Sequence, residues 1–357
     1  MSRWILTALV LFAITAPAAA DARRGRALYE VTCASCHGTD GRGAAAVVAG
    51  FPLVPPDLTD CNFATREPDS DWLAVSHVGG PARGFDRLMP AFGGALTEED
   101  LGHILDHVRT FCDDPAWPRG ELNLPRAQVT SKAYPEDEIA VRAIAEETKL
   151  TTRLVYARRI GARYQLELVA PYVYLEQPDG DWAGGVGDVA VSAKRVLGHS
   201  LAHGAIVSGA LEVVAPTGRT DRGTGAGTTV FEGYLAYGQI VASRGFFQLQ
   251  LGGGIPYNRD HPDEVFARGA LGWRFIPYRH GRQWTPMVEV LGARELVDAA
   301  VTHVDVLPQL QVTLSARQHI VANVGVRLPA NEREGRATQV LVYVIWDWFD
   351  GGFLEGW

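Results

Sequence analysis

Two cysteines three positions apart, followed at once by a histidine, are the residues of this chain with the most specific chemistry. They form the run Cys33-Ala34-Ser35-Cys36-His37, and the chain has only four cysteines in 357 residues. On a helical turn this spacing lets two thiols reach the vinyl groups of one haem edge, while the imidazole lies under the iron. A zinc site would need a second ligand pair, and a thiol redox motif would not need the histidine. The run therefore predicts one covalently bound haem c.

The chain begins with the features of an export signal. Residues 1–20 contain one basic residue, Arg3, an apolar run from Trp4 to Ile14, and small residues before Asp21 that suit cleavage. No later segment has the eighteen consecutive apolar residues of a transmembrane helix, so the mature chain is expected to be soluble or to cross a membrane as strands. Export suits a haem c and implies an oxidising compartment.

Residues 21–113 are expected to form one small helical domain. A first helix is predicted over residues 21–32, and a short helix over residues 71–78 carries Trp72. A last helix starts at Thr97, which can cap it, and three acidic residues follow in its first turn. Its apolar stripe indicates that it packs against the first helix over the haem.

This helical region resembles the class I cytochromes c. The resemblance rests on the Cys-x-x-Cys-His run, on Pro-Pro-Asp-Leu-Thr at residues 55–59 and on Leu-Met-Pro-Ala-Phe-Gly at residues 88–93. In that family the methionine of the Met-Pro pair is the second axial ligand. The resemblance therefore implies Cys33 and Cys36 as thioether anchors and His37 and Met89 as the axial ligands of the haem iron.

The composition agrees with Met89 as a ligand. The chain has three methionines, of which Met1 leaves with the signal and Met287 lies in another domain. The alternatives are that Met89 only fills the core or that His77 takes its place. The family also uses a proline carbonyl to fix the proximal imidazole, and Pro55 or Pro56 could supply it.

Several further side chains of the helical region have two interpretations. Trp72 is expected to line the haem pocket. Cys61 and Cys112 are expected to form a disulfide in an exported domain, and the alternative is two buried thiols. His103 and His107 stand four apart on the last helix, where a solvent-exposed face is expected and a metal pair is the alternative.

From residue 114 to residue 135 the helical pattern stops and prolines interrupt the chain, which predicts a partly extended linker. Beyond it, over residues 136–350, the apolar period changes to two. In residues 163–174 the apolar side chains fall on one face and the polar ones on the other. Twelve such strands are predicted, at residues 136–146, 150–160, 162–175, 186–197, 203–216, 228–242, 245–257, 264–276, 284–296, 303–316, 318–329 and 338–349.

The connections between these strands alternate in length, as in an antiparallel transmembrane β-barrel of the outer membrane. Those after the third, fifth, seventh and eleventh strands are long, and those after the second, sixth and tenth are tight. Trp346, Trp348 and Phe349 at the end of the last strand suit an interfacial aromatic girdle. A water-soluble β-sandwich is the alternative.

If the tight turns are periplasmic, the helical domain and four histidines lie near the periplasmic mouth of the barrel. The histidines, for which ordinary turn positions are expected and a metal or electron relay is the alternative, are His199, His203, His280 and His319. A domain of about 100 residues has a radius of gyration near 13 Å and cannot enter a twelve-stranded lumen. A donor must therefore enter the lumen, or a redox partner must meet the haem at the periplasmic face.

The whole layout resembles the fused cytochrome–porins that take electrons from extracellular ferrous iron, although the barrel here is smaller and the cytochrome has an ordinary methionine ligand. The barrel also loosely resembles channels linked to the degradation of aromatic compounds. We expect an electron carrier of the outer membrane with a small electron donor or a redox partner protein. An oxidase activity towards a metal or a small donor is a further alternative. The sequence shows no group of residues typical of acid–base or nucleophilic catalysis.

Two other functions fit the same sequence. The barrel could be a small-solute channel with a tethered periplasmic cytochrome, or the chain could be a periplasmic redox protein with a soluble β-domain. No basic patch supports a nucleic-acid role, so no nucleic-acid partner is expected.

Overall fold

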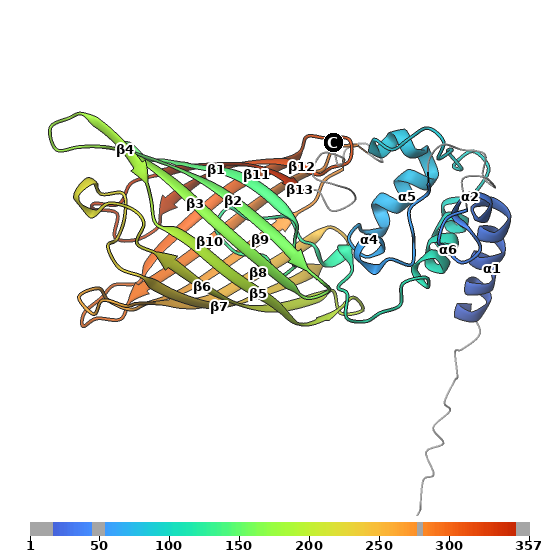
Figure 1. Ribbon diagram of the computed structural model, residues 1–357, viewed down its shortest axis with the longest axis horizontal. Helices are drawn as coiled ribbons and strands as arrows, with labels where there is room; N and C mark the ends of the chain where they lie inside the picture. Colours follow the sequence, from blue (N-terminus) through green and yellow to red (C-terminus); the bar gives the residue numbers. More distant parts are fainter. Residues whose placement is uncertain (1–16, 45–53, 277–280, 348–357) are drawn as a thin grey trace, which may run out of the picture.

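The structure is a computed structural model of the whole chain, which describes residues 17–44, 54–276 and 281–347. A helical domain and a β-barrel lie end to end along the long axis of the molecule (Figure 1). Most of the expected signal peptide, residues 1–16, lies outside the described residues. Among the helices of the described part, none is long and apolar enough to span a membrane.

The helical domain is built around the crossing of its first and last helices. Thr97 and Asp100 form a capping box that starts the last helix. Gly25 allows the close crossing, because an added Cβ would lie 2.0 Å from the carbonyl oxygen of His103. The core contains Tyr29, Leu58, Leu101, Ile104, Leu105 and Val108. The elements are α1 (Pro17–Thr32), α2 (Ala34–His37), α4 (Cys61–Ala64), α5 (Asp69–Val78), η1 (Gly80–Arg83) and α6 (Glu98–Arg109).

One face of α6 differs from expectation. The His107 ring lies 5.2 Å from the Tyr29 ring and 5.1 Å from the Phe111 ring, centroid to centroid. The side chain of His103 is only 14% exposed, and its nearest acidic group, on Glu99, is 3.8 Å away. These histidines therefore pack against neighbouring residues rather than forming a solvent-exposed face.

The strands form a closed antiparallel barrel with twelve strand positions around it, as the period-two pattern predicts. Closure comes from the pairing of the first strand with both the second and the last. A small helix η3 (Thr220–Arg222) lies in one long loop. The strands are β1 (Glu138–Ala145), β2 (Lys149–Ile160), β3 (Tyr164–Glu176), β4 (Trp182–Val186), β5 (Val189–Ser200), β6 (Ala205–Ala215), β7 (Val230–Val241), β8 (Gly245–Pro256), β9 (Glu264–Trp273), β10 (Trp284–Glu295), β11 (His303–Thr313), β12 (Ile320–Pro329) and β13 (Gln339–Asp347).

Strand β4 was not expected, because residues 176–185 were predicted to be a loop. Strand β4 pairs with the C-terminal part of β3, and β5 pairs with the N-terminal part of β3. Strands β4 and β5 therefore occupy one strand position of the barrel. Two glycines in its five residues weaken the strand pattern in the sequence. The long loops lie at the end of the barrel away from the helical domain (Figure 1).

The outer face of the barrel is apolar and the inner face is polar. Exposed apolar side chains at alternating positions of the strands include Leu154, Leu166, Leu168, Val191, Leu211, Leu235, Leu251, Leu271, Val290, Val324 and Val342. Buried inward side chains include Gln165, Lys194, Gln248, Gln250, Glu289, Gln309 and Asn323. A closed barrel of this kind suits a membrane and excludes the soluble β-sandwich.

The aromatic girdle expected at the end of the last strand is only partly described. Trp346 is 8% exposed, so it is packed within the protein instead of facing the lipid interface. Trp348 and Phe349 lie outside the described residues.

The segment predicted to be a linker is instead packed inside the barrel. From residue 118 to residue 137 no residue is exposed, and a short helix, η2 (Gly120–Leu122), is its only regular element. We call residues 118–137 the lumen segment. Leu122 and Tyr134 pack against Val196, Ile206 and Ala236 on the inner face of β5, β6 and β7. The sequence pattern missed this because the segment has no periodicity.

Candidate functional site

The thiols and the imidazole of the Cys-x-x-Cys-His run lie on one helical turn. The backbone N–H groups of Cys36 and His37 both donate to the carbonyl of Cys33, at 3.1 and 2.9 Å, which makes this turn. Both thiols are free of disulfide bonds and half-buried. Burial raises the pKa of the Cys33 thiol. The turn thus brings two thiols outside any disulfide and one imidazole together within five residues.

Two buried ring nitrogens of the helical domain have no hydrogen-bond partner among the described residues. They are Nδ1 of His37 and Nε1 of Trp72. Burial lowers the pKa of His37, which favours the neutral imidazole that a metal ligand requires. Cys33, Trp72 and Phe92 pack against the apolar core. Thiols outside any disulfide, an imidazole whose neutral form is favoured, unpartnered ring nitrogens and an apolar lining fit a haem c.

The loop that carries Met89 is folded tightly on itself. The backbone N–H of Gly80 donates to the carbonyl of Met89 at 2.9 Å, and that of Met89 donates to Asp86 at 3.2 Å. An added Cβ on Gly93 would lie 2.6 Å from the His77 ring, so this histidine packs against the segment after Met89. The pairing of His37 with Met89 on one iron stays a prediction.

Pro55, one of the two prolines expected near the proximal imidazole, lies close to Gly43, which is hydrogen-bonded to the backbone of His37. The backbone of Gly43 donates to the carbonyl of His37 at 2.9 Å, and an added Cβ on Gly43 would lie 3.1 Å from the carbonyl oxygen of Pro55. Neither Pro55 nor Pro56 accepts the Nδ1 proton of His37, because that atom has no partner within the described part of the chain.

A disulfide joins Cys61 to Cys112. It ties the start of α4 to the residues just after α6, across 51 positions of sequence. Arg109, near the end of α6, donates to the carboxylate of Asp69 at 2.9 Å and lies 4.8 Å above the Trp72 ring. The side of the pocket formed by α4 and α5 is therefore fixed to α6.

Barrel side chains satisfy the backbone of the lumen segment, which has almost no regular structure of its own. The carboxylate of Glu289 accepts from the backbone N–H groups of Val129 and Thr130, at 3.1 and 2.6 Å, and from the Thr130 hydroxyl at 2.7 Å. The ammonium group of Lys194 donates to the carbonyls of Lys132 and Tyr134, at 3.1 and 2.9 Å. Buried backbone groups need such partners, so these side chains hold the segment in one position.

The same pattern continues around the barrel. Gln248 on β8 donates to the carbonyl of Pro125 at 2.8 Å, and Gln250 accepts from the backbone of Ser131 at 3.1 Å. On β11, Gln309 accepts from the backbone of Gln128 at 3.1 Å. The lumen segment is thus bound to strands on several sides of the lumen.

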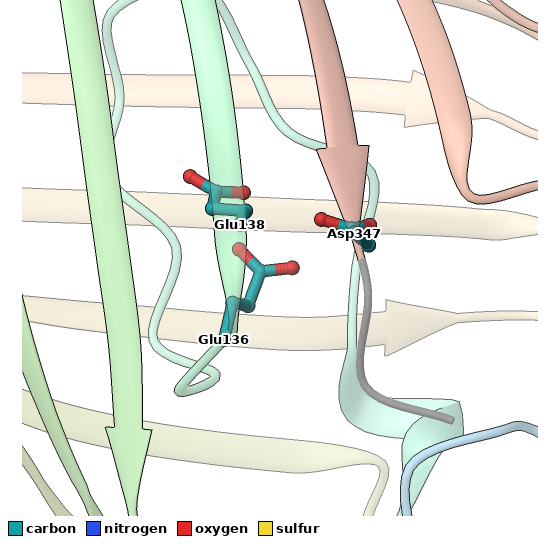
Figure 2. A group of neighbouring side chains, drawn as sticks. All are labelled: Glu136, Glu138 and Asp347. Carbon is teal, nitrogen blue, oxygen red and sulfur yellow. The ribbon is translucent and has the colours of Figure 1, made fainter. Parts of the chain in front are cut away.

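Three carboxylates meet where the lumen segment joins β1, as Figure 2 shows for Glu136, Glu138 and Asp347. They are the one group of three metal-capable side chains found within the described ranges. Lys132 pairs with Glu136 and Arg126 pairs with Glu138, so cationic side chains of the lumen segment offset the acidic charge. We interpret this cluster as an ion-pair network that anchors the segment.

Contacts between the helical domain and the barrel were not foreseen from the sequence. Arg66 pairs with Asp137 at the end of the lumen segment, and both are buried. Glu67 lies 2.9 Å from Nε2 of His319, on the turn before β12. Arg119, at the start of the lumen segment, donates to Asp69 at 2.7 Å. The helical domain is therefore docked onto the mouth of the barrel, with α4 and α5 nearer to it than α1, α2 and α6 (Figure 1).

Of the other three histidines expected at this mouth, His199 and His203 are described and belong to no group of metal-binding side chains found in the described residues. His199 is at the end of β5, and His203 hydrogen-bonds Ser200 at 2.8 Å in the following turn. His280 lies outside the described residues. No group of three metal-capable side chains within the described residues includes a histidine.

Comparisons with known proteins match the two parts separately. A family model described as cytochrome c oxidase, cbb3-type, subunit III matches residues 20–108. Cytochrome c-554(547) of Halothiobacillus neapolitanus is 30% identical over 92 residues, which are 26% of this chain and 98% of that protein. An outer membrane channel from Pseudomonas putida F1 is 12% identical over 63% of this chain and 100% of its own, with a TM-score of 0.45. The KdgM porin is 11% identical over 59% and 99%, with a TM-score of 0.40.

Proposed function

The chain belongs to the cytochrome c family through residues 20–108, and from this premise we propose that it carries electrons at the outer membrane. It is a haem-bearing outer-membrane protein, with one haem c in a domain on the periplasmic side. The finer proposal is that this haem exchanges electrons with a redox partner or a small donor at the periplasmic mouth. A donor that enters the lumen from outside is the alternative.

Four side chains carry the proposal at the haem. Cys33 and Cys36 would attach the haem as thioethers, and His37 and Met89 would be the protein ligands of its iron. A haem held by a histidine and a methionine would supply reversible one-electron exchange. Trp72 offers its indole N–H as a donor within the pocket, since that group has no other partner in the described part of the chain.

The observation that favours electron transfer over solute transport is the filled lumen. The lumen segment has no exposed residue, and its backbone is hydrogen-bonded to inward side chains of β5, β8, β10 and β11. A solute would have to break many of these bonds to pass. The barrel then serves to anchor the haem domain in the membrane.

The same observation favours the periplasmic side for electron exchange. The apolar band of such a barrel is about 25 Å tall, and the lumen segment lies between the outer loops and the helical domain. His37 is on α2, which is farther from the barrel than α4 (Figure 1). A donor in the outer half of the lumen would therefore be separated from the haem by packed protein.

The test uses the full-length protein, with its haem, reconstituted in one orientation in lipid vesicles and in planar bilayers. We expect a low-spin spectrum with a methionine–iron charge-transfer band, very low ion conductance, and fast reduction by a membrane-impermeant donor on the haem side. Fast reduction from the opposite side only would support the lumen-entering donor. High conductance that does not depend on the haem redox state would favour the solute channel and contradict the proposal.

A further inference from the structure

The turn between β11 and β12 brings the barrel into contact with the loop that carries Met89. This turn is closed by hydrogen bonds from Gln318 to the carbonyl of Ser315 at 3.1 Å and from Ile320 to the Ser315 hydroxyl at 3.0 Å. Gln318 has a φ of 64°, in the left-handed region that few side chains adopt. The turn therefore has a defined conformation, in which Arg317 projects from its tip.

Arg317 contacts two adjacent residues of the helical domain. Its guanidinium donates to the carbonyl of Gly84 at 3.2 Å and lies 4.4 Å from the centroid of the Phe85 ring. Gly84 has a φ of 70°, and an added Cβ there would lie 3.3 Å from Cγ of Arg317. The aliphatic part of the arginine thus covers a left-handed residue, and its charged end covers an aromatic ring.

The contacted residues are closely linked to Met89. The backbone N–H of Phe85 donates to Gly80 at 2.9 Å, and that of Gly80 donates to Met89 at 2.9 Å. An added Cβ on Gly80 would lie 3.2 Å from Cβ of Met89, so the two ends of the loop are already in contact. A movement of Gly84 and Phe85 away from the barrel would therefore strain the hydrogen bonds that link Phe85 to Gly80 and Gly80 to Met89.

We infer that Arg317 is a positioning residue, through which the barrel holds the loop of residues 80–89 closed and so keeps Met89 at the haem. This inference rests on the proposed axial role of Met89. It means that the barrel does more than anchor the cytochrome, because the docked geometry sets how firmly the methionine is held. Loss of one cation–π contact and one hydrogen bond should raise the open-loop population about five- to tenfold.

The experiment measures how fast added imidazole displaces the methionine in the ferric, full-length protein, by the loss of the methionine–iron charge-transfer band. Arg317→Ala is compared with Arg317→Lys, which keeps a cation near the ring. The matched control is Arg244→Ala, on the β7–β8 turn at the same end of the barrel. The Arg244 side chain is exposed and makes no hydrogen bond or ion pair within the described residues.

We expect displacement to be about five- to tenfold faster in Arg317→Ala, partly restored in Arg317→Lys, and unchanged in Arg244→Ala. The thermal unfolding of the barrel should be the same in all of them. Equal rates in the Arg317→Ala variant and the wild type would overturn the inference and leave the proposed function intact. If the wild type itself lacks the charge-transfer band, the proposed Met89 ligation fails, and the inference fails with it.

Discussion

The two parts of this molecule bury opposite kinds of side chain. The helical domain closes around an apolar core that contains Tyr29 and Leu101. The barrel exposes its apolar side chains and buries Glu289, Gln248 and Gln250, which are each 1% exposed or less. An apolar core needs only shape complementarity, whereas a polar interior needs a hydrogen-bond partner for every group. The lumen segment supplies hydrogen-bond partners for Glu289, Gln248 and Gln250, so these hydrogen bonds form only when the segment lies inside the barrel.

The largest effect that separates the two parts is expected from Cys33→Ala combined with Cys36→Ala. Without the thiols the haem cannot be attached, so we expect complete loss of covalent haem stain on denaturing gels. The barrel should still fold, because its contacts with the helical domain do not involve α2. Heat-modifiable gel migration measures the folded barrel. A variant that also loses the folded barrel would contradict this separation.

A second prediction concerns the stability of the helical domain alone. Removal of the disulfide by Cys61→Ala combined with Cys112→Ala opens a loop of 51 residues, which should cost about 4 kcal/mol of unfolding free energy in the loop-entropy account. Chemical denaturation followed at the haem absorbance measures this loss. The barrel transition, followed by far-UV circular dichroism, should not shift. An equal shift of both transitions would show that the two parts unfold together.

The third prediction tests the polar interior. Glu289→Gln removes the carboxylate that accepts from Val129 and Thr130, which should cost about 2 kcal/mol and loosen the lumen segment. We expect ion conductance in planar bilayers to rise well above the wild-type level, with an unchanged haem spectrum. Glu232→Gln is the control, because Glu232 alternates with the outward-facing Phe231 on β7 and has no hydrogen bond to the segment among the described residues. Equal conductance in both variants would contradict the closure of the lumen by this segment.

The sequence predicted those features that depend on local patterns. The Cys33–His37 run can be recognised from five adjacent residues. Each strand can be recognised from its own alternation of apolar and polar residues, so the ends of the twelve predicted strands lie within a few residues of the observed ones. The loop before β5 was the exception, since Trp182–Val186 is rich in glycine and pairs with only part of β3.

The lumen segment could not be predicted because its partners are distant in sequence. The backbone N–H of Gln128 donates a hydrogen bond to the side chain of Gln309, 181 positions away, and no sequence pattern in the segment predicts this pairing. A weaker signal was present in the strands. The inward positions of β8 and β11 carry pairs of glutamines, and a small barrel with such an interior needs a polar segment to fill it. Docking through Glu67 and His319 is likewise a long-range contact without a motif.

The smallest expected effect arises where the two parts meet, at Asp71 on α5. Burial and the charge of Glu67 raise the pKa of Asp71 to about 6, although Arg83, 3.0 Å away, opposes this. A raised folded-state pKa stabilises the folded protein fully below about pH 4, and this contribution is lost as the pH rises through about 6. The haem-monitored unfolding midpoint should therefore fall by about 5 °C between pH 4.5 and pH 7.5, the shift that roughly 1 kcal/mol gives in a domain of this size.

The matched variants are Asp71→Asn, in which this pH dependence should flatten, and Asp106→Asn on the exposed side of α6, in which it should persist. If the slope survives in Asp71→Asn, another group titrates at the junction. If it disappears in both variants, the titration is not specific to the docked face. A slope confined to Asp71 would show that the junction buries a charge that neither the apolar domain nor the polar barrel fully compensates, and that Arg83 and His319 only partly offset it.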